Sequence, residues 1–171
     1  MDIAIVGKNS IKIKGKRVTF VVDPSAGSPK TSADAVILLN GLKDVDLNRV
    51  TDSRTVINGA GGYEVAGAKI SATSSPEGII YKLSIDGVSI VLGKTTKSKV
   101  EGISGSQVAV INADSEFNES FVADLESKII VIYGEAKKDA AKKLGAESIT
   151  ETPKITLAKE LPEKMEIAVL G

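Results

Sequence analysis

The sequence predicts a strand-rich α/β fold in which two β-sheets pack together and a few helices lie outside them. Over the first two thirds of the chain, Val, Ile and Thr form short runs separated by Gly, Pro, Asn and Asp, which is typical of short strands joined by tight turns. Two later runs, 107–111 and 128–134, are continuously apolar, as in strands buried on both faces. Helical patterns lie between and after these runs, so the second half is expected to carry the helices.

Short strands dominate the chain as far as Leu92. Gly15 in IKGKR and Gly87 in IDGVS each separate two candidate strands, as hairpin turns require. The expected strands in this region span residues 2–6, 10–14, 17–22, 35–39, 55–58, 63–65, 69–73, 79–85 and 88–92.

Two helices are expected in the last third of the chain. The first lies between the two apolar runs, where Ser115 or Asn118 can cap it and Phe121, Val122 and Leu125 have helical spacing. The second covers 135–144, which opens with a glutamate and is followed by a glycine. Residues 153–171 then predict a strand, a charged turn and a closing strand.

The length and charge of the chain indicate one soluble domain over residues 1–171. The 171 residues are 42% hydrophobic and 26% charged, which suits a globular fold with a buried core. The 22 basic and 22 acidic residues give no overall attraction to nucleic acid or to an anionic membrane. No apolar run approaches the roughly 20 residues of a membrane span, and the N-terminus lacks a signal-peptide pattern, so we expect a cytoplasmic protein.

Histidine and cysteine are both absent from the sequence. The commonest general base, the commonest transition-metal ligand and all thiolate chemistry are therefore unavailable. A zinc hydrolase of the usual kind is excluded by this inventory. Tryptophan is also absent and aromatic residues make up only 4% of the chain, which argues against stacking platforms for bases or sugars.

The segment ILLNGLKDVD (37–46) is shaped like a ligand-carrying loop at the end of a buried strand, but it lacks obvious ligands. Its context resembles the metallo-β-lactamase fold, in particular the small branch of ascorbate-phosphate lactonase-like hydrolases. IVGKNSIKIKGKRVTFVVDP keeps Gly7, Ser10, Asp23 and Pro24 of that family's opening pattern, and ADAVILL leads into NGLKDV where the family has its metal motif. INGAGGYEVAGAKI and ITLAKELPEKMEIAVLG are similar to later segments, so the resemblance spans nearly the whole chain and implies a β-rich αββα sandwich.

The same resemblance implies that the metal site has been lost. Asn40, Leu42 and Val45 stand at three histidine positions of the family motif, and Asp44 alone keeps its identity. Lys94 stands where the family has a bridging aspartate, and the last histidine position falls near Tyr133 or Gly134. We therefore expect no metal, no cofactor and no catalytic residue.

Two alternatives for this site remain open. Oxygen ligands from Asp23, Asp44, Asp46 and Glu64 would suit magnesium or calcium, although the Lys94 ammonium would oppose a cation there. Alternatively, an ion pair between Lys94 and Asp44 replaces the lost metal, in which case removing one partner of a buried pair would cost about 3–5 kcal/mol.

The sequence leaves three functions in competition. The first is a non-catalytic structural or interaction module that self-associates or docks a protein partner. The second is a binding module for a small anionic ligand at the former active-site mouth, lined by Lys8, Asn40, Asp44 and Lys94. The third is a residual hydrolase with an unusual site.

A local basic loop offers a further anion site. It contains Lys94, Lys97 and Lys99, and the residues at 93–95 imitate the end of a phosphate loop. The glycine spacing does not match that motif, because five residues rather than four separate Gly87 and Gly93.

Overall fold

The computed structural model describes residues 1–113, 116–158 and 160–171, and its framework consists of two β-sheets. The six-stranded sheet has the order β15-β1-β2-β3-β5-β7. Its strands are β1 (Asp2–Gly7), β2 (Ser10–Lys14), β3 (Thr19–Val22), β5 (Ala35–Ile37), β7 (Thr55–Ile57) and β15 (Lys154–Thr156).

The eight-stranded sheet has the order β14-β16-β13-β12-β11-β10-β9-β8. Its strands are β8 (Gly61–Val65), β9 (Ala68–Ser75), β10 (Gly78–Ile85), β11 (Val88–Gly93), β12 (Val108–Asn112), β13 (Ile129–Tyr133), β14 (Glu151–Thr152) and β16 (Glu166–Leu170). A separate two-stranded ladder joins β4 (Thr31–Ser32) to β6 (Val50–Thr51), next to the 3₁₀-helix η1 (Leu47–Arg49).

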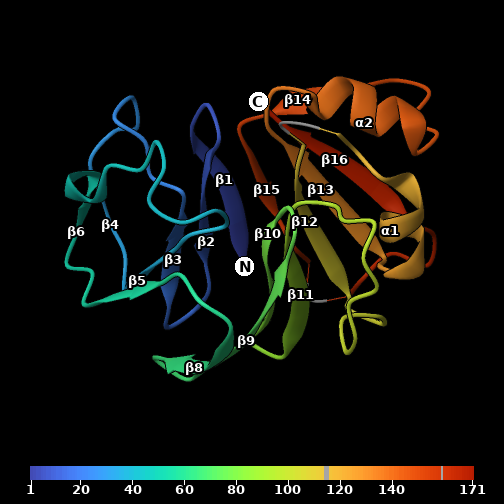
Figure 1. The fold of residues 1–171 in the computed structure, drawn as a ribbon. Helices are drawn as coiled ribbons and strands as arrows, with labels where there is room; N and C mark the ends of the chain where they lie inside the picture. The colour runs from blue at the N-terminus through green and yellow to red at the C-terminus, as the bar shows by residue number, and fades with distance from the viewer. Residues whose placement is uncertain (114–115, 159) are drawn as a thin grey trace.

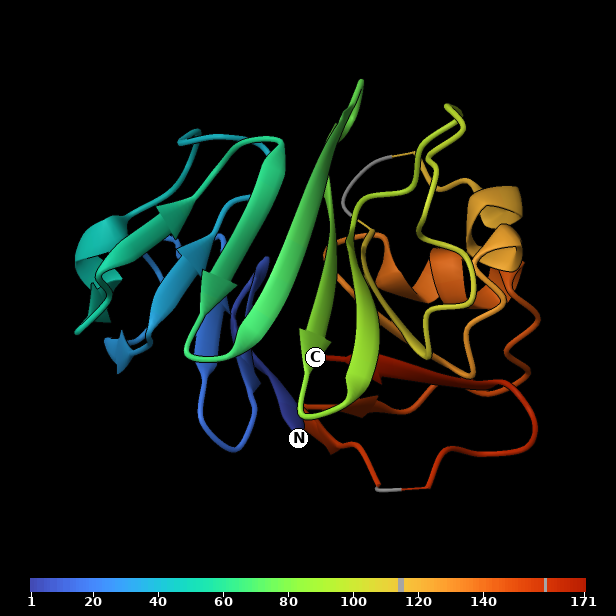
Figure 2. The same ribbon diagram turned by 90° about the horizontal axis from the view of Figure 1, so that it is seen from below.

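The two sheets face each other across one apolar core (Figures 1 and 2). Inward side chains of the antiparallel strands β1 to β3 meet those of β9 to β13, because side chains alternate between the faces of each strand. This core includes the fully buried side chains Ile3, Ile11, Ile13, Phe20, Tyr81, Leu83, Ile90 and Leu92.

A second core lies on the outer side of the eight-stranded sheet. In β12, Val108 and Val110 join the core between the sheets, whereas Ala109 and Ile111 join the outer one. The predicted double-sided burial of the apolar runs is confirmed, because β12 and β13 are buried at every position. The helices α1 (Glu119–Asp124) and α2 (Lys137–Lys143) cover this face (Figure 1).

The predicted sandwich is confirmed, with two differences in detail. Both α-helices of the described residues lie on the eight-stranded sheet, and the other sheet is flanked by loops, β4, β6 and η1 (Figure 1). The second helix begins at Lys137, two residues later than the sequence pattern suggested, and it has no side-chain cap. Asn118 caps α1 as expected, by accepting a hydrogen bond of 3.1 Å from the Ser120 amide. Ser115, the other candidate cap, lies outside the described residues.

Parallel pairing brings strand ends from both sheets toward one region. β3 runs parallel to β5, and β11, β12, β13 and β16 are mutually parallel neighbours. The amide of Ile79 at the start of β10 donates a hydrogen bond of 2.8 Å to the carbonyl oxygen of Leu39, and this contact ties the two sheets together. The residues that follow β3, β5 and β11 lie close to the last residue of β12.

Among the described residues, no helix has the length and apolar character needed to cross a membrane.

Candidate functional site

A cavity of about 360 Å³ lies where these strand ends meet. Its volume is at the lower end of the range of small-molecule sites, which is roughly 300–1,000 Å³. The residues that line it are Lys8, Asn9, Asp23, Ser25, Asn40, Gly41, Lys43, Asp44, Val45, Lys94 and Asn112.

The topology explains why residues so distant in sequence line one cavity. Asp23 directly follows β3, and Lys94 directly follows β11. Asn112 is the last residue of β12, whereas Lys8 and Asn9 form the turn between β1 and β2. Ligands commonly bind outside the carboxyl ends of parallel strands, because loops from neighbouring strands converge there.

The loop 40–46 is folded tightly enough to present several of its residues to the cavity. Gly41 has φ +67° and Asp44 has φ +60°, two positions in the left-handed region that glycine and aspartate tolerate best. The Val45 amide donates to the Leu42 carbonyl at 3.3 Å, and the Asp46 amide donates to the Pro24 carbonyl at 2.7 Å. The second bond fixes this loop to the one that follows β3.

Asp23 makes hydrogen bonds that hold the wall of this cavity together. Its Oδ1 accepts a hydrogen bond of 2.9 Å from the buried amide of Leu39, and its carbonyl oxygen accepts one from the Ser10 hydroxyl. Its backbone has φ +44°. The carboxylate therefore joins the end of β3 to the end of β5.

A chain of serine hydroxyls runs from the core to the cavity wall. The buried Ser10 donates to the Asp23 carbonyl, and the buried Ser28 donates to Ser10 Oγ at 3.2 Å. Because Ser28 has used its only proton, Ser25 must be the donor in the 3.1 Å contact between Ser25 Oγ and Ser28 Oγ. The Ser25 oxygen keeps its lone pairs, so it can act as a hydrogen-bond acceptor in the cavity.

Two asparagine oxygens in the cavity wall are buried without a hydrogen-bond donor among the described residues. They are Oδ1 of Asn112, a residue only 4% exposed, and Oδ1 of the half-buried Asn9. A buried polar atom without a partner costs about 1–3 kcal/mol, and folded proteins retain few of them. A ligand or an ordered water in the cavity can complete the hydrogen bonding of these two oxygens.

The charged residues of the wall have a small positive excess. Three lysines and two aspartates line the cavity, so the net charge of the lining is 3 − 2 = +1. Lys8 forms an ion pair of 2.7 Å with Glu135 at the surface, Lys94 is half-buried, and Lys43 is exposed. The exposed Lys43 is therefore a cavity lysine that an anionic ligand can reach.

Most residues predicted for the site do line this cavity. Lys8, Asn40, Asp44, Val45 and Lys94 lie in its wall, whereas the Leu42 side chain is 60% exposed and is not among the lining residues. The predicted ion pair between Asp44 and Lys94 stays a prediction. Because Asp44 is exposed, however, the pair is not the buried one for which a loss of 3–5 kcal/mol was expected.

Two of the four proposed oxygen ligands lie elsewhere. Asp46 caps η1, where it accepts hydrogen bonds of 3.1 Å from the Asn48 amide and from Arg49 Nε. Partial burial acts to raise the pKa of Asp46, but these hydrogen bonds outweigh it and lower that pKa. Glu64 is exposed on β8, opposite Lys69 of β9.

The residues of this wall do not fit a zinc ion. The sequence contains neither histidine nor cysteine, and the described residues contain no group of three or more carboxylates placed to hold a metal. Asp23 already accepts the Leu39 amide, and the Lys94 side chain adds positive charge to the same wall. An ammonium beside a divalent cation is electrostatically unfavourable.

Sequence reasoning did not identify five lining residues: Asn9, Ser25, Gly41, Lys43 and Asn112. The signal available for Asn112 was its position directly after the apolar run 107–111, because polar residues at strand ends often face ligands. Ser25 and Asn9 carried no comparable signal, since their roles depend on contacts between separate loops.

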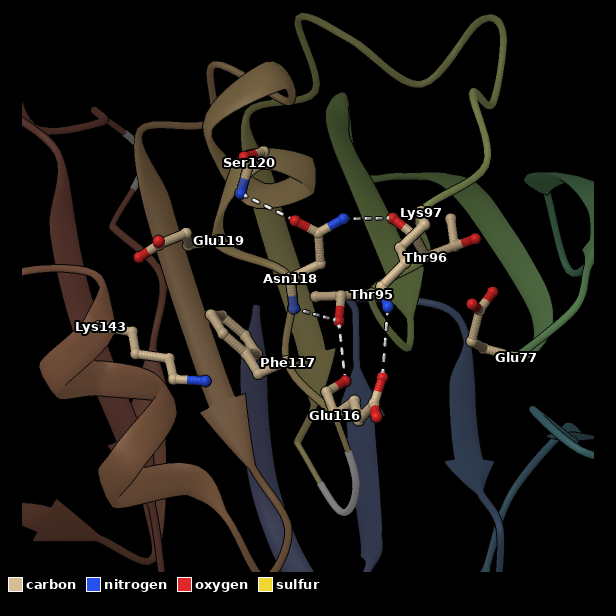
Figure 3. A pocket seen from close by; sticks show the side chains of 10 residues that line it. All are labelled: Glu77, Thr95, Thr96, Lys97, Glu116, Phe117, Asn118, Glu119, Ser120 and Lys143. Carbon is tan, nitrogen blue, oxygen red and sulfur yellow. Dashed lines mark hydrogen bonds and ion pairs between the residues drawn. The ribbon is translucent and has the colours of Figure 1, made fainter.

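A larger cavity of about 680 Å³ lies beside α1 (Figure 3). The lysines of the predicted basic loop do not all line the same cavity. Lys97 lines it and pairs with Glu116 at 3.5 Å, whereas Lys94 lines the other cavity. The buried Thr95 hydroxyl accepts the Asn118 amide at 2.9 Å, so it helps to position α1. Acidic and basic side chains are mixed around this cavity: Glu77, Lys97, Glu116, Glu119 and Lys143.

Comparison with known proteins identifies the fold. No protein-family model matches the sequence, and no curated protein is significantly similar to it. A structure from Thermotoga maritima, described as a Zn-dependent hydrolase assigned to the metallo-β-lactamase superfamily, superposes with a TM-score of 0.77. Its sequence identity is 20%, and the match covers 99% of this chain and 98% of that one.

Two further structures are similar at lower identity. Zn²⁺-bound PqqB from Methylobacterium extorquens matches with a TM-score of 0.55 and 12% identity, over 86% of each chain. The E377D mutant of CmlA β-hydroxylase matches with a TM-score of 0.60 and 10% identity, over 84% of this chain and 49% of that one. Together with the two packed sheets and the outer helices, these similarities show that the chain adopts the metallo-β-lactamase fold.

Proposed function

We propose that this chain is a metal-independent, non-catalytic protein that binds a small anionic ligand in the cavity lined by Asn40, Asp44 and Lys94. The observation that carries the proposal is the composition of the cavity wall. Positions at which the resembled hydrolases hold metal contribute amide, aliphatic, carboxylate and ammonium groups here, and the exposed Lys43 adds a positive charge. Function depends on such a site rather than on the fold.

Several features support binding rather than turnover. The wall contains no histidine that could serve as a general base, and Asp23 is engaged by the Leu39 amide. Ser25 donates its proton to Ser28, and no basic group of the described structure accepts a proton from it. A serine in that state is a weak nucleophile.

The experiment that tests the proposal is a thermal-denaturation titration with inorganic phosphate, at constant ionic strength in chloride. Saturable stabilisation is expected, and a ligand at 100 times its Kd stabilises the native state by about 2.7 kcal/mol. Lys43→Ala should weaken the effect, because it removes a cavity lysine that is exposed. Lys69→Ala is the matched control, since Lys69 is an exposed lysine on β9 outside the cavity.

The proposal fails if phosphate and other small anions produce no saturable shift. It also fails if Lys69→Ala weakens the shift as much as Lys43→Ala does, because the effect would then reflect general surface charge.

A second candidate function is interaction with a protein partner or self-association. The observation that favours it is the 60% exposure of Leu42, an apolar side chain in the loop that forms part of the cavity wall. Among the described residues, Leu47, Val56 and Met165 are also exposed large apolar residues, but they do not belong to the loop 40–46. Under this candidate Leu42→Ser would shift the sedimentation-velocity profile toward a smaller species, whereas an unchanged profile would argue against self-association through this loop.

A further inference from the structure

The uncharged polar atoms of the same cavity indicate which hydrogen-bonding groups its ligand contains. Asn112 is 4% exposed and lies at the end of β12, and its Oδ1 has no hydrogen-bond donor within the described part of the chain. Asn9 Oδ1, from the β1–β2 turn, is also buried and is equally unpartnered there. Both residues line the cavity.

Ser25 adds a third acceptor by a different route. The order of donation in the serine chain runs from Ser25 to Ser28 to Ser10 and ends at the Asp23 carbonyl. Because each hydroxyl has one proton, the chain leaves the Ser25 oxygen as an acceptor in the cavity wall. The Asp44 carboxylate in the same wall is an acceptor as well.

An anion without hydroxyl groups would bond the lysines of the cavity wall but would leave its acceptor oxygens without donors. The oxygens of an ionised carboxylate accept hydrogen bonds from the lysines, but they have no protons to give to Asn9, Asn112 or Ser25. A neutral polyol would have the opposite deficiency, because it carries no charge to pair with the exposed Lys43. The complementary ligand contains both an anionic group and several hydroxyl donors.

We infer that the cavity takes a small hydroxylated anion, such as a polyhydroxy carboxylate, whose anionic group meets Lys43 and Lys94 and whose hydroxyl groups donate to Asn112, Asn9 and Ser25. This inference rests on the proposed function, since it names the chemical class of ligand for the same cavity. A site built to bond hydroxyl groups rejects analogues that lack them more strongly than a purely electrostatic site does, because its buried polar atoms then stay unpaired.

The test is isothermal titration calorimetry with three six-carbon probes and one simple anion. Gluconate has one carboxylate and several hydroxyl groups, hexanoate has the carboxylate without hydroxyls, and sorbitol has hydroxyls without a charge. The fourth probe is inorganic phosphate. Gluconate is expected to bind at least about tenfold more tightly than hexanoate or sorbitol, a difference of about 1.4 kcal/mol.

Variants test whether the Asn112 and Ser25 side chains contribute to the affinity for gluconate. Asn112→Leu and Ser25→Ala should each weaken gluconate about tenfold and leave the affinity for hexanoate nearly unchanged, because they remove acceptors and no positive charge. Lys43→Ala should weaken both. Ser71→Ala is the matched control for Ser25→Ala, since Ser71 is an exposed serine on β9 outside the cavity.

The outcomes separate the inference from the proposed function. If hexanoate binds as tightly as gluconate, or if phosphate binds and gluconate does not, the inference is overturned and the anion site survives. If none of the three anions binds, the proposed function and the inference both fail. If gluconate binds but Asn112→Leu and Ser25→Ala leave its affinity unchanged, the acceptor argument is wrong.

Discussion

The amide of Leu39 donates a hydrogen bond of 2.9 Å to Oδ1 of Asp23 and so joins the ends of β3 and β5. Asp23→Ala leaves this buried amide without an acceptor, and we expect the free energy of unfolding to fall by about 1–3 kcal/mol. Asp23→Asn keeps an acceptor oxygen and tolerates φ +44°, so it should lose much less. Urea denaturation of both variants checks this, and equal stabilities would show that the carboxylate does not fix the loop.

The contact between the two sheets depends on a glycine at the start of β10. Gly78 has φ +137°, and an added Cβ would overlap the Leu39 carbonyl oxygen that accepts the Ile79 amide. Gly78→Ala should therefore lower the free energy of unfolding by at least about 1–3 kcal/mol. Gly67→Ala is the control, because Gly67 also has positive φ but has open space around it. Equal losses in denaturant titrations would mean that backbone strain, and not the close approach, explains the effect.

Asn112 is expected to cost stability in the ligand-free protein. Asn112→Leu replaces a buried amide whose oxygen lacks a donor in the described structure with an apolar group of similar size, so the free energy of unfolding should rise by about 1 kcal/mol. Asn118→Ala should lower it by about 0.5–2 kcal/mol, since Asn118 caps α1. Thermal denaturation compares the two, and a strong loss of stability in Asn112→Leu would show that the amide has a structural role.

Tyr81 makes stability fall at alkaline pH. Burial, helped by the nearby Asp23 and Tyr63, raises the pKa of Tyr81 above its ordinary value of 10.0. The unfolded chain therefore releases this proton at lower pH than the folded chain does, so the stabilisation is complete below about pH 10 and is lost as pH rises further. Urea titrations between about pH 8 and pH 11 should show this decline.

Tyr81→Phe should flatten the decline. It should also lower stability at about pH 8, because the hydroxyl donates to the carbonyls of Leu38 at 2.7 Å and Ile57 at 3.2 Å. Tyr63→Phe is the control for the slope, since Tyr63 is only half-buried. An unchanged slope in Tyr81→Phe would assign the alkaline transition to other groups.

Asp44 and Lys94 should be coupled only weakly. Asp44 is exposed and Lys94 is half-buried, so a double-mutant cycle should give a coupling energy of about 0–1 kcal/mol. The measurement compares Asp44→Ala, Lys94→Ala and the double variant in urea. A coupling energy of several kcal/mol would indicate a desolvated pair, as the sequence alone had suggested.

The sequence predicted the core of the fold because the burial of one or both faces of a strand produces a regular pattern of apolar residues. The alternation in β9 and β10 and the continuous apolar runs of β12 and β13 follow from which faces of each strand are covered. The two-residue strands β4 and β6 show no such pattern, because so short a strand pairing depends on the tertiary structure around it. The shortened start of α2 has a similar cause, because the segment before Lys137 lacks a side-chain cap.

The part of the site that could be predicted is the part marked by the resemblance to the family motif. Asn40, Asp44 and Lys94 were identified from that resemblance, whereas the role of Ser25 depends on a hydroxyl chain that joins three separated positions. Asn112 had a local signal, its position directly after the apolar run 107–111, but its place in this cavity depends on the pairing of β12 with β11. Contacts between loops are tertiary properties, and single-sequence patterns do not record them.

The central claim, a metal-independent anion site, is tested most directly by titrating the protein with phosphate after treatment with a chelating resin. The protein should be prepared without a polyhistidine tag, and elemental analysis should verify the removal of metal. Our account predicts saturable binding that is unchanged by the treatment and is weakened by Lys43→Ala. Binding that disappears with the metal and returns when zinc is added would contradict the account.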